Sequence, residues 1–233
     1  MISVVHLLAL VWCVLAEVPS DEERGDIIEC HTRLRAEVQP PASNMLLMTY
    51  STHLEQMATK FVSKCPPPNQ DSGNDSPLQG VGVITSTDGR DEPNFITFAC
   101  EVDERSYNYG DDTTGTESHD YRVMVTASTN KVGCAAQRCA HTSRSGQSYY
   151  YFLACLYQPS LPTLDGKPYE KGGSCTKCPN GYRCHQNQCY TNETTSVNEQ
   201  QTIGEADNTN AISSIFSPLP LLMLALYLVH LVK

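Results

Sequence analysis

The sequence is poor in positive charge. Its 16 lysines and arginines stand against 26 aspartates and glutamates, which gives a formal net charge of -10. No run of lysine or arginine is longer than a pair, so the sequence lacks the basic footprint that nucleic-acid binding requires. We therefore expect no nucleic acid among the partners of this protein.

Catalytic signatures are also scarce. The sequence contains no Gly-x-Ser-x-Gly motif, the strained turn that exposes the serine of many hydrolases. Ser118, His119 and Asp120 are consecutive, but neighbours in sequence do not form the relay geometry of a catalytic triad. We predict that the protein is not an enzyme and has no cofactor, with a hydrolase as the less favoured alternative.

Cysteine is plentiful, and its distribution indicates an oxidising compartment. Ten of the eleven cysteines lie in the polar stretch between two apolar segments, and their even number is typical of disulfide-bonded extracellular proteins. A sulfur in a disulfide offers no thiolate, which disfavours cysteine catalysis.

The first apolar segment runs from Val4 to Leu15 and ends at Ala16, a small residue of the kind that signal peptidase recognises. It lacks a preceding lysine or arginine, but it is too short to span a bilayer comfortably. We predict a signal peptide at residues 1–16, cleaved after Ala16. The sequons at Asn74 and Asn192 fit glycosylation of an extracellular chain.

The second apolar segment occupies residues 215–233, with Lys233 as its last residue. The residues before it are small and polar, and Asp207 and Ala211 are candidate attachment sites, which is the pattern of a GPI-anchor signal. A single-pass transmembrane helix is the alternative, since about 18 residues can just span a bilayer core. We expect display on the cell surface through the membrane, with a soluble secreted form as a further product.

Three helices are predicted. The capping box Ser20–Glu23 begins a helix that Pro40 stops, and a second box, Thr52–Glu55, begins a helix with one continuous apolar stripe that Pro66 stops. Residues Asn94–Tyr109 are a candidate third helix.

Strands are predicted later in the chain. The β-branched and aromatic runs Tyr121–Thr126 and Tyr149–Tyr157 indicate strands, and Lys131–Ala136 is a shorter one. Residues 66–89 are rich in Asn, Asp, Ser, Gly and Pro and are predicted to be a loop.

This order of elements sets the predicted domains. Helices followed by strands indicate an α+β fold with an antiparallel sheet at residues 17–159, followed by a connector at 160–174. Residues 175–189 have too few apolar side chains for a core, so cross-links must hold this small module. A zinc knuckle with His185 as the fourth ligand is the alternative. Residues 190–214 are predicted to be a disordered polar stalk.

Four segments resemble one family in the same order. Residues 29–45 resemble the first helix and turn of the CAP superfamily of cysteine-rich secretory, antigen 5 and pathogenesis-related 1 proteins. Residues 132–135 and 152–159 are similar to its later strand motifs, and residues 168–179 to the hinge of cysteine-rich secretory proteins. The plan is similar to membrane-anchored peptidase inhibitor 16 type and helminth venom-allergen-like proteins. The resemblance implies an α-β-α sandwich with a small antiparallel sheet and a disulfide-held hinge module.

The resemblance also implies a disulfide pattern. Two bridges would occupy family positions in the sandwich and two would hold the hinge, while Cys30 and Cys100 stand where the family usually has no cysteine, and we predict that they pair with each other. The expected pairs are Cys65–Cys139, Cys134–Cys155, Cys175–Cys184, Cys178–Cys189 and Cys30–Cys100.

Many CAP proteins carry two histidines and two acidic residues that can hold a divalent cation. By position, the four residues here are Asn69, Val81, Asp103 and Asp120, so both imidazoles and one carboxylate are replaced. Imidazole and carboxylate ligands give such a site its affinity, so we expect no metal. A shifted site made by His119 with Asp103 and Asp120 is the alternative.

Two kinds of ligand remain. CAP domains bind sterols, fatty acids or other lipids, and the aromatic side chains of Phe95, Phe98 and Tyr107 could line such a site. The same three residues could instead belong to the core, with the loops of the domain acting as a protein-interaction or protease-inhibitor-like surface. His31 and Arg35 on the first helix are interpreted as packing and surface ion pairing.

Overall fold

The computed structural model describes residues 16–66, 78–89, 92–110, 118–143, 146–160 and 166–192. The predictions for the signal peptide, most of the stalk, the apolar tail, Asn69, Asn74, Asp207 and Ala211 lie outside these ranges. Within the described ranges, no helix has both the length and the apolar character needed to cross a membrane.

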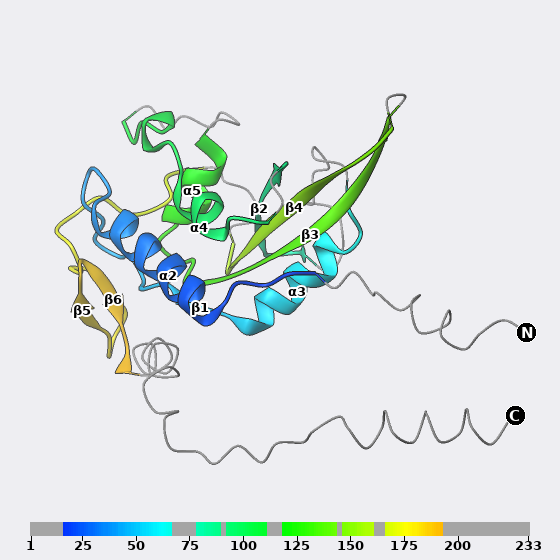
Figure 1. Cartoon of the computed structure of the whole chain (residues 1–233). Helices are drawn as coiled ribbons and strands as arrows, with labels where there is room; N and C mark the ends of the chain where they lie inside the picture. The colour runs from blue at the N-terminus through cyan, green and yellow to red at the C-terminus, as the bar shows by residue number, and fades with distance from the viewer. Residues whose placement is uncertain are drawn as a thin grey trace, which may run out of the picture. The chain divides into compact units, whose positions relative to one another are not determined.

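The centre of the domain is a four-stranded sheet (Figure 1). Its order is β1 (Thr49–Tyr50), β3 (Lys131–Ser143), β4 (Gly146–Gln158) and β2 (Gly82–Asp88). The pairs β3–β4 and β2–β4 are antiparallel, as predicted, whereas β1 runs parallel to β3.

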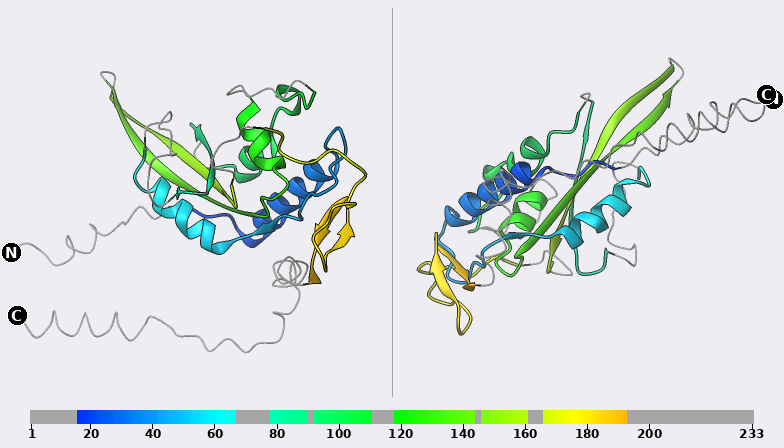
Figure 2. Two further views of the ribbon diagram at one scale, coloured as in Figure 1. Left: turned by 180° about the vertical axis from the view of Figure 1, so that it is seen from behind. Right: turned by 60° about the horizontal axis from the view of Figure 1, so that its bottom comes forward.

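Helices cover both faces of this sheet (Figure 2). On one face lie α2 (Asp21–Ala36), α4 (Phe95–Cys100) and α5 (His119–Val125), and on the other lies α3 (Thr52–Val62). The side chains of β4 alternate between the two sides, with Leu153 in the first core cluster and Phe152 in the second. The predicted α-β-α sandwich is therefore confirmed.

The first helix begins as predicted. The Ser20 hydroxyl accepts from the backbone N–H of Glu23, and the Glu23 carboxylate accepts from the backbone N–H of Ser20, which completes the capping box. The second predicted box is wrong by one residue. Ser51 rather than Thr52 caps α3. The Glu55 side chain does not cap the helix but binds Arg24 of α2.

One strand prediction and one loop prediction are wrong. Residues Tyr121–Thr126, predicted as a strand, lie in and just after α5, because the whole short run is buried and its apolar pattern cannot separate a helix from a strand. Residues 82–88, predicted as part of a loop, form edge strand β2. Its outward Thr and Ser side chains hid the alternation that buries Ile84.

The third predicted helix is shorter than expected. Asn94 caps α4 by accepting from the backbone N–H of Thr97, but α4 ends at Cys100. A single 3-10 turn, η3 (Glu104–Ser106), follows, and the rest of the predicted range has no helix.

Five disulfides cross-link the described residues, in the same pairs that the resemblance implied. They join Cys30–Cys100, Cys65–Cys139, Cys134–Cys155, Cys175–Cys184 and Cys178–Cys189. The Cys30–Cys100 bridge ties α2 to the end of α4. The bridges at 175–189 replace the thiolates that the zinc-knuckle alternative requires.

The small C-terminal module is docked on the main domain. It contains the hairpin of β5 (Arg183–His185) and β6 (Gln188–Tyr190). The backbone N–H of Cys189 donates to Met45 O at 2.7 Å, and Leu47 N–H donates back to Cys189 O at 2.9 Å. The fully buried Gln188 side chain adds a hydrogen bond to Thr32 O at the end of α2. The module therefore extends the sandwich rather than hanging from a free hinge.

Candidate functional site

A cavity of about 280 Å³ lies among β2, β4, α4 and α5. Ile84, Phe98 and Met124 supply apolar wall, while Glu101 and Asp120 supply the carboxylates. Asp120 is the only one of the four expected metal positions that lines this cavity among the described residues. Sequence reasoning missed Glu101, since nothing in its neighbourhood marks it as facing a cavity.

Two of the other expected metal positions, Val81 and Asp103, lie away from this cavity. Val81 packs against the core cluster on the α3 side of the sheet. Asp103 accepts hydrogen bonds from the side chain and backbone of Arg105, which hold the pKa of this exposed carboxyl below its usual range. In the described part of the chain, the one cluster of three potential metal ligands is Cys175, Cys178 and Cys189, all of them in disulfides.

The residues of the alternative metal site and of the serine triad are not brought together either. His119 Nδ1 lies 3.0 Å from Asp120 Oδ1, and both side chains are about half exposed. Asp103 does not join them, because its carboxylate is bonded to Arg105. Ser118 is buried, with 1% of its surface exposed, whereas the side chains of His119 and Asp120 are exposed to solvent. The three side chains therefore do not face one common site.

A buried polar pair lies behind the cavity. His31 Nδ1 donates to Ile27 O at 2.7 Å, so Nε2 accepts from the Tyr157 hydroxyl at 3.0 Å. Burial lowers the pKa of His31 to about 4, and burial together with the nearby Asp120 charge raises the pKa of Tyr157. The neutral imidazole is thus a packed structural group rather than an exposed base.

Arg35 is a second buried group on α2, and the predicted surface ion pairing of His31 and Arg35 is wrong. Among the described residues, the Arg35 guanidinium has no carboxylate partner and instead donates to backbone carbonyl oxygens. Burial lowers the pKa of Arg35 to about 9. The acceptors are the carbonyls of Leu46, Met124, Thr126, Ala127 and Thr129. One side chain thereby fixes the loop that follows α5.

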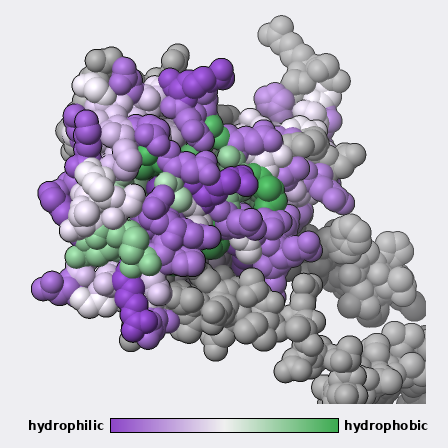
Figure 3. Space-filling model, turned by 90° about the vertical axis from the view of Figure 1, so that its left-hand side faces the viewer, coloured by the Kyte–Doolittle hydropathy of each residue, from purple (hydrophilic) through white to green (hydrophobic). Residues whose placement is uncertain are grey.

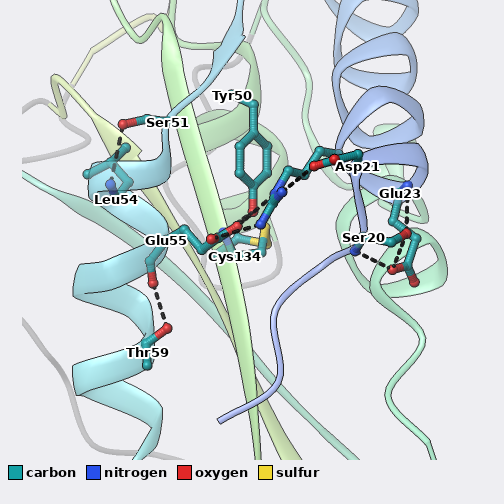
Figure 4. Close-up of polar contacts among 11 residues, drawn as sticks. Ser20, Asp21, Glu23, Tyr50, Ser51, Leu54, Glu55, Thr59 and Cys134 are labelled. Atoms are coloured by element: carbon teal, nitrogen blue, oxygen red, sulfur yellow. Dashed lines mark hydrogen bonds and ion pairs between the residues drawn. A yellow bond between two sulfur atoms is a disulfide. The ribbon is translucent and has the colours of Figure 1, made fainter. Parts of the chain in front are cut away.

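A third polar cluster joins both helical layers (Figure 4). The guanidinium of Arg24 binds both oxygens of the Glu55 carboxylate at 2.9 and 3.0 Å, and the Tyr50 hydroxyl donates to the same carboxylate at 2.7 Å. The backbone N–H of Cys134 donates to the Tyr50 oxygen. Every member is held by another member, as a structural network requires.

The three aromatic residues predicted to line a ligand site do not line one cavity together. Phe95 is buried in the core near the N-terminal segment, and Phe98 lines the 280 Å³ cavity. Tyr107 belongs to a third core cluster, where its ring packs on Tyr121. One of the three therefore remains available to a ligand of that cavity.

The most distinctive surface is the outer end of the β3–β4 hairpin (Figure 1). We call residues 138–143 and 146–150 the hairpin arm. Strand β2 ends opposite Tyr151, and beyond that point the described residues of the two arm strands pair with each other alone. Tyr149 is 49% exposed, and the guanidinium of Arg138 lies 4.3 Å from the centre of its ring. An aromatic run in the sequence contains Tyr149, but only the register shows which end projects.

The comparisons with known proteins agree with this architecture. The family described as Cysteine-rich secretory protein family, CAP, matches residues 28–157. The chain is 32% identical over 190 residues to human Cysteine-rich secretory protein LCCL domain-containing 2, covering 74% of this chain and 37% of that protein. It is 29% identical over 174 residues to mouse Peptidase inhibitor 16, covering 73% and 34%. The chain thus spans about a third of the length of these curated relatives.

Solved structures show the same fold. The crystal structure of Hookworm Platelet Inhibitor superposes with a TM-score of 0.56 at 22% identity, covering 75% of this chain and 93% of that one. The crystal structure of Na-ASP-1 gives a TM-score of 0.55 at 19% identity, covering 77% and 50%.

Proposed function

Because the chain belongs to the CAP family of cysteine-rich secretory proteins, we propose that it is a non-enzymatic extracellular domain that binds a protein partner through the hairpin arm. The family includes secreted extracellular members, and five disulfides suit that environment.

The observation that carries this proposal is the Arg138–Tyr149 pair. Tyrosine and arginine are among the residues that dominate binding energy at protein interfaces. Here the two side chains are already in contact on a two-stranded arm, so less side-chain entropy is lost when a partner covers them. In the described residues, Tyr149 and Val18 are the two large hydrophobic side chains that are clearly exposed.

A protease is the partner class that the relatives favour. Mouse Peptidase inhibitor 16 bears the name of a peptidase inhibitor, and it shares 29% identity with 73% of this chain. A long, stiff hairpin is a suitable shape for entering the cleft of another protein.

Absence of catalysis and of a family-type metal is part of the proposal. The cavity with Asp120 and Glu101 receives no imidazole from the described residues, and Ser118 is buried. Two carboxylates without imidazole offer a transition metal little affinity at this site.

The test uses a panel of purified extracellular proteases and receptors captured on a surface. The Arg138→Ala/Tyr149→Ala double variant should bind the partner at least about tenfold more weakly than the wild type. The matched control is Tyr182→Ala/Arg183→Ala, which changes the same residue types on the C-terminal module. Equal affinities for the wild type and the arm variant would refute the proposal.

Lipid binding is the second candidate, and the position of Phe98 favours it. Phe98 forms part of the apolar wall of the 280 Å³ cavity together with Val102. That volume lies at the lower end of ligand pockets, which is why protein binding is preferred. Saturable uptake of tritiated sterol that is lost in Phe98→Ala would support a lipid ligand, while no uptake leaves protein binding.

We also propose that a GPI anchor at Asp207 or Ala211 tethers the domain to the membrane, and that Asn74 and Asn192 are glycosylated. Asn192 is exposed, as a glycan site must be. Treatment of intact expressing cells with phosphatidylinositol-specific phospholipase C should release the protein. Retention on treated cells would favour the transmembrane alternative.

A further inference from the structure

A second cavity, which shares no residue with the hairpin arm, lies where the connector crosses the main domain. It has a volume of about 450 Å³ and is open to solvent. Its wall comes from Asn44 after α2, Tyr109 after η3, the loop 126–128 after α5, and residues 167–171. We call it the connector cleft. The face of the molecule drawn in Figure 3 is largely hydrophilic, with a few hydrophobic patches.

The connector cleft has a fixed wall. Ala127 N–H donates to Pro168 O at 2.7 Å, the Tyr109 hydroxyl donates to Tyr169 O at 3.0 Å, and Glu170 N–H donates to Asn44 Oδ1 at 3.0 Å. The rings of Tyr109 and Tyr169 are stacked with their centroids 5.0 Å apart. These hydrogen bonds hold residues 168–170 against the main domain, which lowers the entropy lost when a ligand binds.

Two lysines of this wall, Lys167 and Lys171, supply positive charge. Neither Lys167 nor Lys171 forms an ion pair with a described residue. The Lys167 Nζ atom lies 4.3 Å from the centre of the Tyr109 ring, which positions this ammonium at the cleft. The Glu170 carboxylate also lines the cleft, but it is paired with Lys177. In a chain with a net charge of -10, this local excess of positive charge is unusual.

The remaining polar groups of the connector cleft are mainly donors. Asn44 uses its Oδ1 to accept from Glu170 N–H, which leaves its amide NH₂ to donate. Ser128 is exposed and adds a hydroxyl. A wall of ammonium, amide and hydroxyl donors fits a ligand that is rich in acceptors and negatively charged.

We propose that the connector cleft binds an acidic glycan, a saccharide chain that bears sulfate or carboxylate groups. The ammonium groups of lysine are point charges that bind sulfate and carboxylate groups alike. No arginine, with its planar bidentate guanidinium, lines this wall. Hydroxyl and amide donors beside the two charges suit the ring oxygens and hydroxyls of a sugar. Because the cleft is open to solvent, it can admit one segment of a longer saccharide chain, such as the glycans that surround cells.

The test measures binding of the full-length, glycosylated protein to immobilised heparin at about 50 mM NaCl and again at about 300 mM. The wild type should bind, and added salt should weaken binding. Lys167→Gln/Lys171→Gln should reduce affinity about tenfold or more. The matched control, Lys60→Gln/Lys64→Gln, removes the same charge from exposed positions on and after α3 and should stay within about twofold of the wild type.

Several outcomes would overturn the proposal. They are no heparin binding by the wild type at low salt, an equal loss in the control pair, and no loss in the cleft pair. Stronger binding to phosphatidylserine vesicles or to polyglutamate than to heparin would replace the glycan by a lipid surface or an acidic peptide. Both lysine variants should unfold at the same urea concentration as the wild type. A difference in heparin affinity then reflects binding and not stability.

Discussion

His31 on α2 and Tyr157 on β4 meet inside the core, with His31 Nε2 and the Tyr157 hydroxyl oxygen 3.0 Å apart. Both side chains are completely buried. The pair locks the first helix to the central strand of the sheet, directly behind the cavity that contains Asp120. Its protonation state therefore bears on the stability of the whole sandwich.

The first prediction concerns acid. The pKa of His31 falls from 6.5 in the unfolded chain to about 4 in the fold, chiefly through burial. The unfolded chain therefore takes up this proton first as the pH falls, so the stability contributed by the neutral imidazole is complete above pH 6.5 and is lost toward pH 4. The shift corresponds to roughly 3 kcal/mol at most.

Urea unfolding at several pH values measures this effect. His31→Gln keeps hydrogen-bonding groups but cannot titrate, so its free energy of unfolding should fall less than that of the wild type over the same pH interval. Identical pH dependence in the two proteins would show that His31 is not the group responsible.

The second prediction concerns the Arg24–Glu55 ion pair. The Arg24 and Glu55 side chains are only 18% and 10% exposed, so Glu55→Ala leaves the Arg24 guanidinium with the exposed Asp21 carboxylate as its remaining ionic partner and should cost about 2 kcal/mol. Arg24→Met/Glu55→Leu should cost clearly less, because it removes both charges together. Urea midpoints of the single and double variants decide the matter, and a double variant as unstable as Glu55→Ala would contradict the account.

The third prediction concerns Gly133, where β3 passes the start of α3. A Cβ atom at this position would lie 2.4 Å from Glu55 N and 2.6 Å from Ser51 O, both rigid backbone atoms. Gly133→Ala should therefore destabilise the fold by at least about 2 kcal/mol. Gly25→Ala is the control, since a Cβ there meets no atom within 4 Å. Thermal unfolding that ranks the two variants equally would argue against this close approach.

The fourth prediction compares two disulfides. Cys30 and Cys100 are 70 residues apart, so removing their bridge should cost about 4 kcal/mol by the loop-entropy relation. Cys175 and Cys184 are 9 residues apart, for which the same relation gives about 3 kcal/mol. Peptide mapping under non-reducing conditions checks the pairs, and urea unfolding of the two Cys→Ala pairs checks the order.

Sequence reasoning succeeded where a pattern was long or chemically specific. Helix α2 was predicted chiefly from its capping box, helix α3 from its apolar stripe, and strand β4 from its run of aromatic side chains. Helix α5 was missed because its residues Tyr121–Val125 are all buried and show no helical period.

Site residues were harder to predict for a related reason. Asp120 was placed by its distance from Cys134 along the chain, whereas Glu101 reaches the same cavity through the short turn after α4. Tyr149 looked like any other residue of the aromatic run. Its exposure depends on where β2 stops, and that edge strand was itself hidden by polar side chains.

The central claim is that the hairpin arm recognises a protein. The most direct measurement is site-specific photo-crosslinking on cells that display the full-length chain, with p-benzoylphenylalanine in place of Tyr149 or, as the control, Tyr182. The account predicts a discrete extracellular protein crosslinked from position 149 and not from position 182, with the crosslink lost in Arg138→Ala. No crosslink from position 149, or the same products from both positions, would contradict it.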